Sequence, residues 1–125
     1  MLAPRSIAIV GASEKPDSWA PEIERSLRHV GFDGELYPIN PKYDEVWGRR
    51  CRASVSELQR GVDLAVIVVP APVAVRMVDE CGAAGVRSAM VVSSGFAEAG
   101  DAGRTLQAEL RETALRHRLP VLGPK

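Results

Sequence analysis

The sequence predicts an α/β fold, namely a Rossmann-like doubly wound parallel sheet with helices on both faces. Apolar, β-branched runs alternate with helical patterns along the chain, in the order β-α-β-α-β-α-β-α-β. The third apolar run, DLAVIVV at 63–69, is continuous, which is typical of a strand buried on both faces of a parallel sheet. Right-handed crossovers leave few topologies, and for about five strands the simplest order is 3-2-1-4-5.

The first elements are bounded by proline and glycine. The first strand is expected at Ser6–Val10, followed by a helix over 20–30 whose apolar residues recur at helical spacing. Gly31 suits the left-handed residue that ends such a helix. The second strand is expected at Glu35–Ile39, where Pro38 indicates a strand end or an edge of the sheet.

The rest of the chain repeats the alternation. Ser54 and Glu57 have the spacing of a capping box and predict the start of a short helix. The remaining elements are expected at 63–69 (strand), 72–84 (helix), 88–92 (strand), 103–118 (helix) and 120–123 (strand).

Length and charge narrow the class of protein. A chain of 125 residues suits one domain, here 1–125. Lys+Arg is 16 and Asp+Glu is 16, so the basic excess of a nucleic-acid binder is missing. The longest apolar run, 64–75, is interrupted by two prolines and is too short to span a membrane. Since the N-terminal MLAPRS has no apolar signal core, we expect a cytoplasmic protein.

The two cysteines are expected to be free structural thiols. Cys51 and Cys81 are thirty positions apart and form no C-x-x-C motif, which argues against a metal site or a redox pair. Cys81 lies in the small-residue stretch DECGAAG and is expected to pack as a small apolar side chain.

A ligand site is expected beyond the carboxyl ends of the strands, where the strand order reverses. With the order given above, that point lies between the first and fourth strands. The segments that follow the strands are GASEKPDSWA, NPK, PAP and SSGFAEAG. The first has no G-x-G-x-x-G, but its small and hydroxyl residues precede a helix N-terminus, which suits phosphate. A plain turn built around Gly11 is the alternative.

The segment after the second strand bears on the cofactor. NAD enzymes usually place a carboxylate there for the ribose hydroxyls, whereas this chain has Asn40, Pro41 and Lys42. A lysine suits a phosphate on the adenosine ribose, which NADP carries at the 2′ position and coenzyme A at the 3′ position. The alternative is a solvated surface lysine.

The two later segments favour coenzyme A. Pro70 and Pro72 form a stiff wall directly after a buried strand. The stretch SSGF supplies hydroxyl groups, and Phe96 within it is expected to pack under its loop, with ligand contact as the alternative. Arg49, Arg50 and Arg52 are expected to form a solvated basic loop.

Six blocks of the chain together resemble the CoA-binding domain of ADP-forming acyl-CoA synthetases, a group related to the alpha subunit of succinyl-CoA synthetase. In order, they are IAIVGAS, YPINPKYDEVWGRRC, VDLAVIVVPAP, CGAAGV, VVSSGFAE and LPVLGP, and they cover nearly the whole chain. The resemblance implies a Rossmann-like fold with coenzyme A as its ligand. The residues it implies at the ligand are Gly11, Ala12, Ser13, Ser18, Trp19, Asn40, Pro41, Lys42, Val69, Pro70, Ala71, Ser94 and Gly95.

The chain departs from the family's pattern at two places. Trp19 stands where a small residue is usual and Ala20 where glycine is usual, which bears on ligand affinity. After LGP the family continues with an asparagine and a second, flavodoxin-like domain, which would hold the phosphorylated histidine; here Lys125 takes the asparagine's place. The resemblance therefore implies a piece excised from a longer ligase, without catalysis of its own and acting with further ligase domains or a subunit.

No catalytic or metal-ligating set is visible in the sequence. His29 and His117 lie near predicted helix ends and are expected at the surface. Three other functions remain open: a stand-alone CoA-binding regulatory module, the CoA-binding part of a fused lysine acyltransferase and, less favoured, an NADP-binding oxidoreductase domain. The last is disfavoured because the glycine fingerprint and a proton donor are missing.

Overall fold

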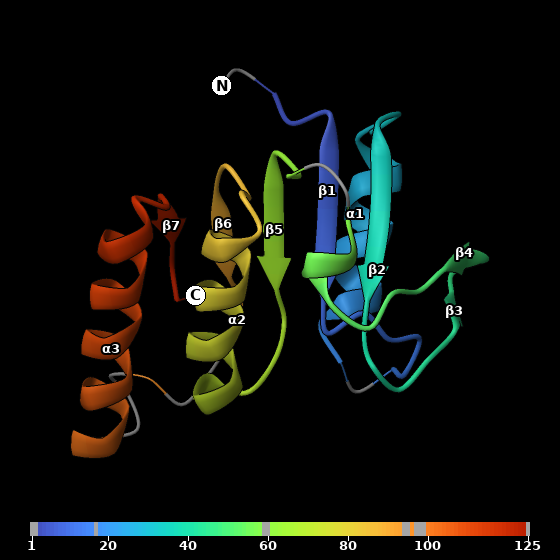
Figure 1. Ribbon diagram of the computed structural model, residues 1–125. Coiled ribbons are helices and arrows are strands. Elements are labelled where there is room, and N and C mark those ends of the chain that lie inside the picture. Colours follow the sequence, from blue (N-terminus) through green and yellow to red (C-terminus); the bar gives the residue numbers. More distant parts are fainter. Residues whose placement is uncertain (1–2, 17, 59–60, 94–95, 97–99, 125) are drawn as a thin grey trace.

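The structure is a computed structural model that describes residues 3–16, 18–58, 61–93, 96 and 100–124. A parallel sheet lies at its centre, as the sequence predicts (Figure 1). Its strands are β1 (Ser6–Val10), β2 (Glu35–Ile39), β5 (Leu64–Ile67), β6 (Ala89–Val91) and β7 (Val121–Leu122), in the order β2-β1-β5-β6-β7.

The predicted strand order, 3-2-1-4-5, is wrong, because β5 lies beside β1 and β2 is the outer strand of that half, which gives 2-1-3-4-5. Ala65, Val66 and Ile67 of β5 are all buried, which requires covered faces and neighbours on both sides. Pro38 of β2 lacks an amide hydrogen, and its carbonyl accepts from Arg52 N (3.1 Å) on the side away from β1. Since both polar groups of a residue in a parallel strand point to the same side, the missing donor costs no bond to β1.

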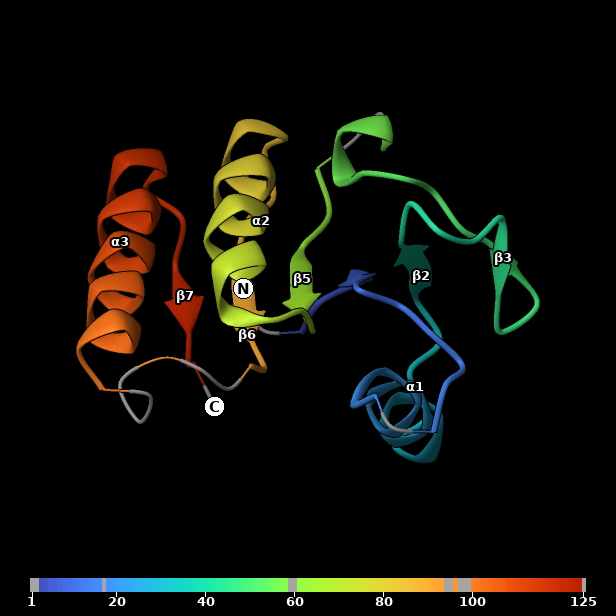
Figure 2. The ribbon, with the colours of Figure 1, turned by 90° about the horizontal axis from the view of Figure 1, so that it is seen from below.

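Helices cover both faces of the sheet (Figure 2). One face carries α1 (Ala20–His29), and the other carries η1 (Val55–Glu57), α2 (Ala71–Ala83) and α3 (Asp101–His117). The alternation along β1 explains the two layers of core, because Ile7 and Ile9 belong to one buried cluster and Ala8 and Val10 to the other.

Glycine ends two of the helices, as expected for Gly31. Gly31 after α1 and Gly85 after α2 have φ values of +77° and +80°. Arg118 takes the same left-handed conformation after α3, with φ +54°. The N-cap of η1 is also confirmed, because the Ser54 hydroxyl accepts from Ser56 N at 3.1 Å, whereas Glu57 accepts from Ala53 N at 3.1 Å and not from Ser54 N as in a capping box.

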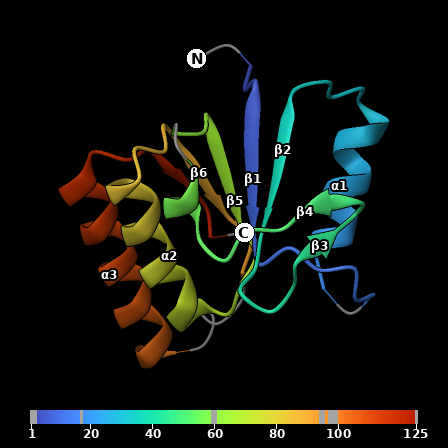
Figure 3. The same cartoon turned by 45° about the vertical axis from the view of Figure 1, so that its right-hand side comes forward.

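The segment expected as a basic loop contains a small hairpin. Its strands are β3 (Glu45–Val46) and β4 (Arg49–Arg50), which lie beyond β2 in Figure 3. Trp47 and Gly48 form the two-residue turn with φ values of +55° and +70°, as a type I′ turn requires. Both arginines of β4 are exposed, which confirms that part of the prediction.

Three further findings concern the described part of the chain. No helix in it is long and apolar enough to cross a membrane. Its His, Cys, Asp and Glu side chains form no group of three or more that could hold a metal ion. Cys51 and Cys81 are both buried free thiols, as predicted.

Candidate functional site

The strand order reverses between β1 and β5, not between the first and fourth strands as the sequence analysis placed it. The chain leaves β1 for α1 on one face of the sheet and leaves β5 for α2 on the other face (Figures 1 and 2). A cleft of about 860 Å³ opens at this point, lined by the segments after β1, β2 and β5 together with η1 and α2. This is where a doubly wound sheet is expected to bind its ligand.

The cleft brings together residues from three of the four predicted segments. The predicted residues that line it are Gly11, Ser13, Asn40, Pro41, Lys42, Val69 and Pro70. Ala12 and Ala71 are buried beside it and do not line it. Ser18 and Trp19 also lie outside the lining, with the Trp19 side chain 65% exposed. Ser94 and Gly95 fall outside the described residues.

The turn after β1 is shaped by Gly11. Its φ is +91°, and a Cβ atom there would lie 2.1 Å from the carbonyl oxygen of Val68. The amides of Gly11 and Ala12 both donate to the carbonyl of Ile39, at 2.8 and 3.1 Å. These two amides are therefore engaged within the protein, which supports the turn interpretation of Gly11.

Asn40 connects the first two loops and orients Lys42. Its side-chain nitrogen donates to the carbonyl of Ala12 at 2.9 Å, and its side-chain oxygen accepts from Lys42 N at 2.9 Å. The second bond forms an Asx turn, which fixes the backbone from which the exposed Lys42 side chain extends. The lysine predicted from the sequence thus lines the cleft from a braced position.

The polar cleft residues Ser54, Ser56, Arg76 and Glu80 carry no signal of a ligand site that was recognised in the sequence, and Lys15 was expected there only as part of the segment GASEKPDSWA. Together with Lys42, the cleft has three cationic side chains and the Glu80 carboxylate among its described lining residues. This balance suits a ligand with several negative charges. Arg76 and Glu80 are one helical turn apart on α2, so their spacing could have suggested a shared face.

The side chains outside the cleft clarify three expectations. Phe96 is 1% exposed and belongs to the core, so the packing interpretation is confirmed. His29 is exposed, as expected. His117 is partly covered, and its Nε2 lies 2.7 Å from Asp79 Oδ1 in an exposed contact, so it is a surface residue that is held by a neighbouring helix.

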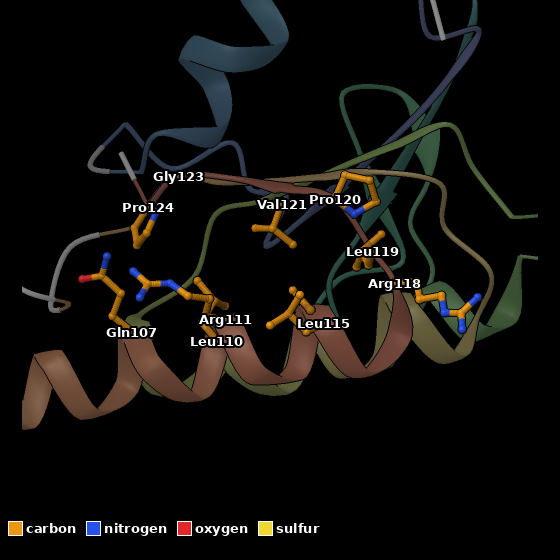
Figure 4. Close-up of a pocket in the computed structure, with 11 residues that line it drawn as sticks. Gln107, Leu110, Arg111, Leu115, Arg118, Leu119, Pro120, Val121, Gly123 and Pro124 are labelled. Carbon is orange, nitrogen blue, oxygen red and sulfur yellow. The ribbon is translucent and has the colours of Figure 1, made fainter.

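A second, smaller cavity lies at the other end of the sheet, between α3 and β7 (Figure 4). It measures about 390 Å³, and Leu115 and Arg111 of α3 line it opposite Pro120 and Val121. None of the predicted ligand residues lines it. The larger cleft at the reversal of the strand order is therefore the candidate ligand site.

A parallel sheet with helices on both faces and a polar cleft at the reversal of its strand order defines a protein of the nucleotide-binding α/β class. Residues 5–125 match the family model described as "CoA binding domain", and the chain belongs to that family.

Two of the similar proteins are a ligase and a synthetase, of which this chain covers only a small part. The chain is 40% identical over 121 residues to the ADP-forming acetate–CoA ligase of Methanocaldococcus jannaschii, covering 97% of this chain and 17% of that protein. A structure of the dinucleotide forming acetyl-coenzyme A synthetase 1 of Ca. Korarchaeum cryptofilum, in complex with phosphate and ADP, matches with a TM-score of 0.88 and 44% identity, over 97% of this chain and 26% of that chain.

A conserved hypothetical protein of Pyrococcus furiosus also matches, with a TM-score of 0.75 and 31% identity. That match covers 94% of this chain and 91% of the Pyrococcus chain. The domain thus occurs both as a small part of a ligase and as nearly the whole of a short protein.

Proposed function

We propose that this chain is the CoA-binding part of an ADP-forming acyl-CoA synthetase and that it holds coenzyme A in the 860 Å³ cleft. The observation that carries the proposal is the position of Lys42. It lines the cleft at the end of β2, where a NAD enzyme would present a carboxylate, and Asn40 braces its backbone.

The chemistry of the lining fits the parts of coenzyme A. Lys42 is placed for the 3′-phosphate, and Lys15 and Arg76 add positive charge for the pyrophosphate. Val69 and Pro70 supply an apolar wall. These contacts are predictions, as are the ligand contacts expected of Ala12, Ser18, Trp19, Ala71, Ser94 and Gly95.

In this proposal the domain binds and orients coenzyme A, while the acid is activated and transferred in further ligase domains or a partner subunit. The support is that the chain spans 17% of the Methanocaldococcus ligase and 26% of the Korarchaeum synthetase chain. The acyl-transfer chemistry belongs to the parts of such proteins that this chain does not cover.

Calorimetric titration tests the ligand. The 125-residue chain is titrated with coenzyme A and, separately, with NADP. We expect coenzyme A to bind more tightly, because the loop after β1 lacks the glycines that allow a dinucleotide pyrophosphate to approach closely. Tighter binding of NADP would overturn the proposal and favour an oxidoreductase domain.

A stand-alone CoA-binding module is the second candidate. The Pyrococcus protein, nearly all of which is covered by the match, shows that a chain of this kind occurs without the rest of a ligase. The mass of the polypeptide in the source cells distinguishes the two candidates. A product several times the size of this chain supports the synthetase, and one of about the same size supports the module.

A further inference from the structure

Where η1 meets α2, the cleft is lined by a polar cluster of Ser54, Ser56 and Glu80, of which Ser54 and Glu80 are half-buried and Ser56 is exposed. The Ser54 hydroxyl donates to Glu80 Oε1, and the Ser54 and Ser56 hydroxyl oxygens lie 2.8 Å apart. The same Ser54 oxygen accepts from Ser56 N at 3.1 Å. These contacts join η1 to α2, and all three side chains line the cleft. We call these three residues the acceptor cluster, for the following reason.

The positions of the hydroxyl protons determine which hydrogen bonds the cluster can form with a ligand. A hydroxyl has one proton, and that of Ser54 goes to Glu80. Ser56 must therefore be the donor in the contact between the two hydroxyls. Both hydroxyl protons are used inside the cluster, and no described residue donates to Glu80 Oε2. What remains toward the cleft is a set of acceptor lone pairs, so the cluster complements a ligand group that donates hydrogen bonds.

Apolar side chains lie between the acceptor cluster and the cationic loops. Val73 and Met77 are one turn apart on α2 and line the cleft, as does Val69 after β5. Glu80 follows Val73 by seven residues, about 10 Å along a helix. Along α2 the cleft therefore passes from the carboxyl edge of the sheet, across the apolar Val73 and Met77 and past the exposed Arg76, to acceptor groups.

This succession of cationic, apolar and acceptor surfaces matches the adenosine 3′-phosphate end of coenzyme A. The inference therefore rests on the proposed function. The 3′-phosphate and the base of coenzyme A are attached to the same ribose. With the phosphate at Lys42, the base lies in this cleft, and the pantetheine arm leads away beyond the pyrophosphate. Adenine has flat apolar faces and one exocyclic amino group, which is a hydrogen-bond donor.

We propose that the acceptor cluster recognises the 6-amino group of adenine, with Glu80 as the residue that determines specificity for the base. A 6-oxo purine would present an acceptor to the same lone pairs. The cleft would then disfavour it, because an acceptor facing the half-buried Glu80 carboxylate gains no hydrogen bond and is repelled.

The test compares two ligands with the same phosphates, namely coenzyme A and its analogue with hypoxanthine in place of adenine. We expect the wild-type chain to bind coenzyme A about tenfold more tightly than the analogue. Glu80→Gln should bring the two affinities close together, because an amide can donate to the 6-oxo group. Lys42→Ala is the matched control, which should weaken both ligands and leave their ratio unchanged.

The outcomes separate this proposal from the proposed function. If wild type binds coenzyme A but does not discriminate, or if Glu80→Gln keeps the full ratio, recognition of the base by the cluster is wrong and the CoA site stands. If wild type binds neither ligand, the proposed function itself fails, and this inference fails with it. Circular dichroism checks folding. Should Glu80→Gln not fold, the wild-type chain is titrated with a coenzyme A analogue whose purine lacks the 6-amino group, and equal affinity for this analogue and for coenzyme A would overturn the proposal.

Discussion

At the scale of single residues, Asn40 shows how much of the site depends on one side chain. Its amide joins the loops after β1 and β2 through Ala12 and fixes the backbone of Lys42. The sequence predicted Asn40 and Lys42 at the ligand because they follow a strand. It could not predict the contact of Asn40 with Ala12, or that of Ser54 with Glu80, because these contacts join residues 28 and 26 positions apart.

The buried thiols provide a test at this scale. Burial, with a smaller contribution from the Glu80 charge, raises the pKa of the Cys81 thiol to about 12. Burial also raises the pKa of Cys51. Because the thiolate is the reactive form, we expect a thiol reagent at pH 8 to label the native chain slowly and the urea-unfolded chain rapidly. Rapid labelling of both thiols in the native chain would contradict the structure.

The raised pKa of Cys81 also predicts the direction of a stability change. The native state holds this proton more tightly than the unfolded chain, whose thiol titrates near the ordinary value of 9.0. The stabilisation is therefore complete below about pH 9 and is lost as the pH rises toward 12. Cys81→Ala should show a smaller fall in melting temperature between pH 8 and pH 10 than wild type.

Gly11 and Gly48 form a matched pair for mutation. Both have positive φ, but only at Gly11 would a Cβ meet backbone, at 2.1 Å, whereas nothing lies within 4 Å at Gly48. Gly48→Ala should cost about 1–2 kcal/mol for the backbone conformation alone. Gly11→Ala should cost clearly more in urea unfolding, because the overlap with Val68 adds to it. Equal losses in the free energy of unfolding would mean that the close approach of Gly11 to Val68 adds nothing to the cost of the substitution.

At the scale of the elements, the residues of a strand indicate its position in the sheet. The alternation of strands and helices predicted the fold class, and each main element was found within a few residues of its expected range. The order was wrong although two signals favoured the true one. Pro38 indicated an edge for β2, and the continuous apolar run indicated a central position for β5. Crossover rules alone do not decide between the two strand orders, whereas these two residue signals favour the observed one.

The hairpin of β3 and β4 was not predicted from the sequence, because its strands are short and its turn has an unusual residue. The strands β3 and β4 have two residues each, which is too short for a periodic signal. Trp47 occupies a positive-φ position of the turn, where Asn, Asp or Gly is usual.

The contact between α2 and α3 predicts a response to acid. Asp79 on α2 meets His117 at 2.7 Å and Arg116 at 3.0 Å on α3, and these hydrogen bonds lower the pKa of the Asp79 carboxyl from its ordinary 3.8. The stabilisation of the native state by the Asp79 carboxylate is therefore present above about pH 3.8 and is lost as the pH falls through the lower native pKa. We expect the melting temperatures of wild type and Asp79→Asn to converge between pH 5 and pH 2.5. Curves that stay parallel would show that the contact adds nothing.

At the scale of the whole molecule, the proposed function of this chain is the binding of coenzyme A and not catalysis. The chain belongs to the CoA binding domain family and spans 17% of a similar ligase. In the proposed function the cleft residues hold and orient coenzyme A, and no step of acyl transfer is assigned to them.

The 125-residue chain should therefore make no acyl-CoA from acid, coenzyme A and ATP. A thioester assay of the chain alone, against a blank without protein, measures this. Synthesis above the blank would mean that the chain contains chemistry which its cleft does not explain.

The most direct test of the central claim, that this cleft holds coenzyme A by its ribose phosphate, is a double-mutant cycle at Lys42. Wild type and Lys42→Ala are each titrated with coenzyme A and with dephospho-CoA, which lacks the 3′-phosphate. Because Lys42 is exposed, we predict a loss of about threefold to tenfold for coenzyme A and almost none for dephospho-CoA. Equal losses for both ligands, or none for either, would contradict the claim.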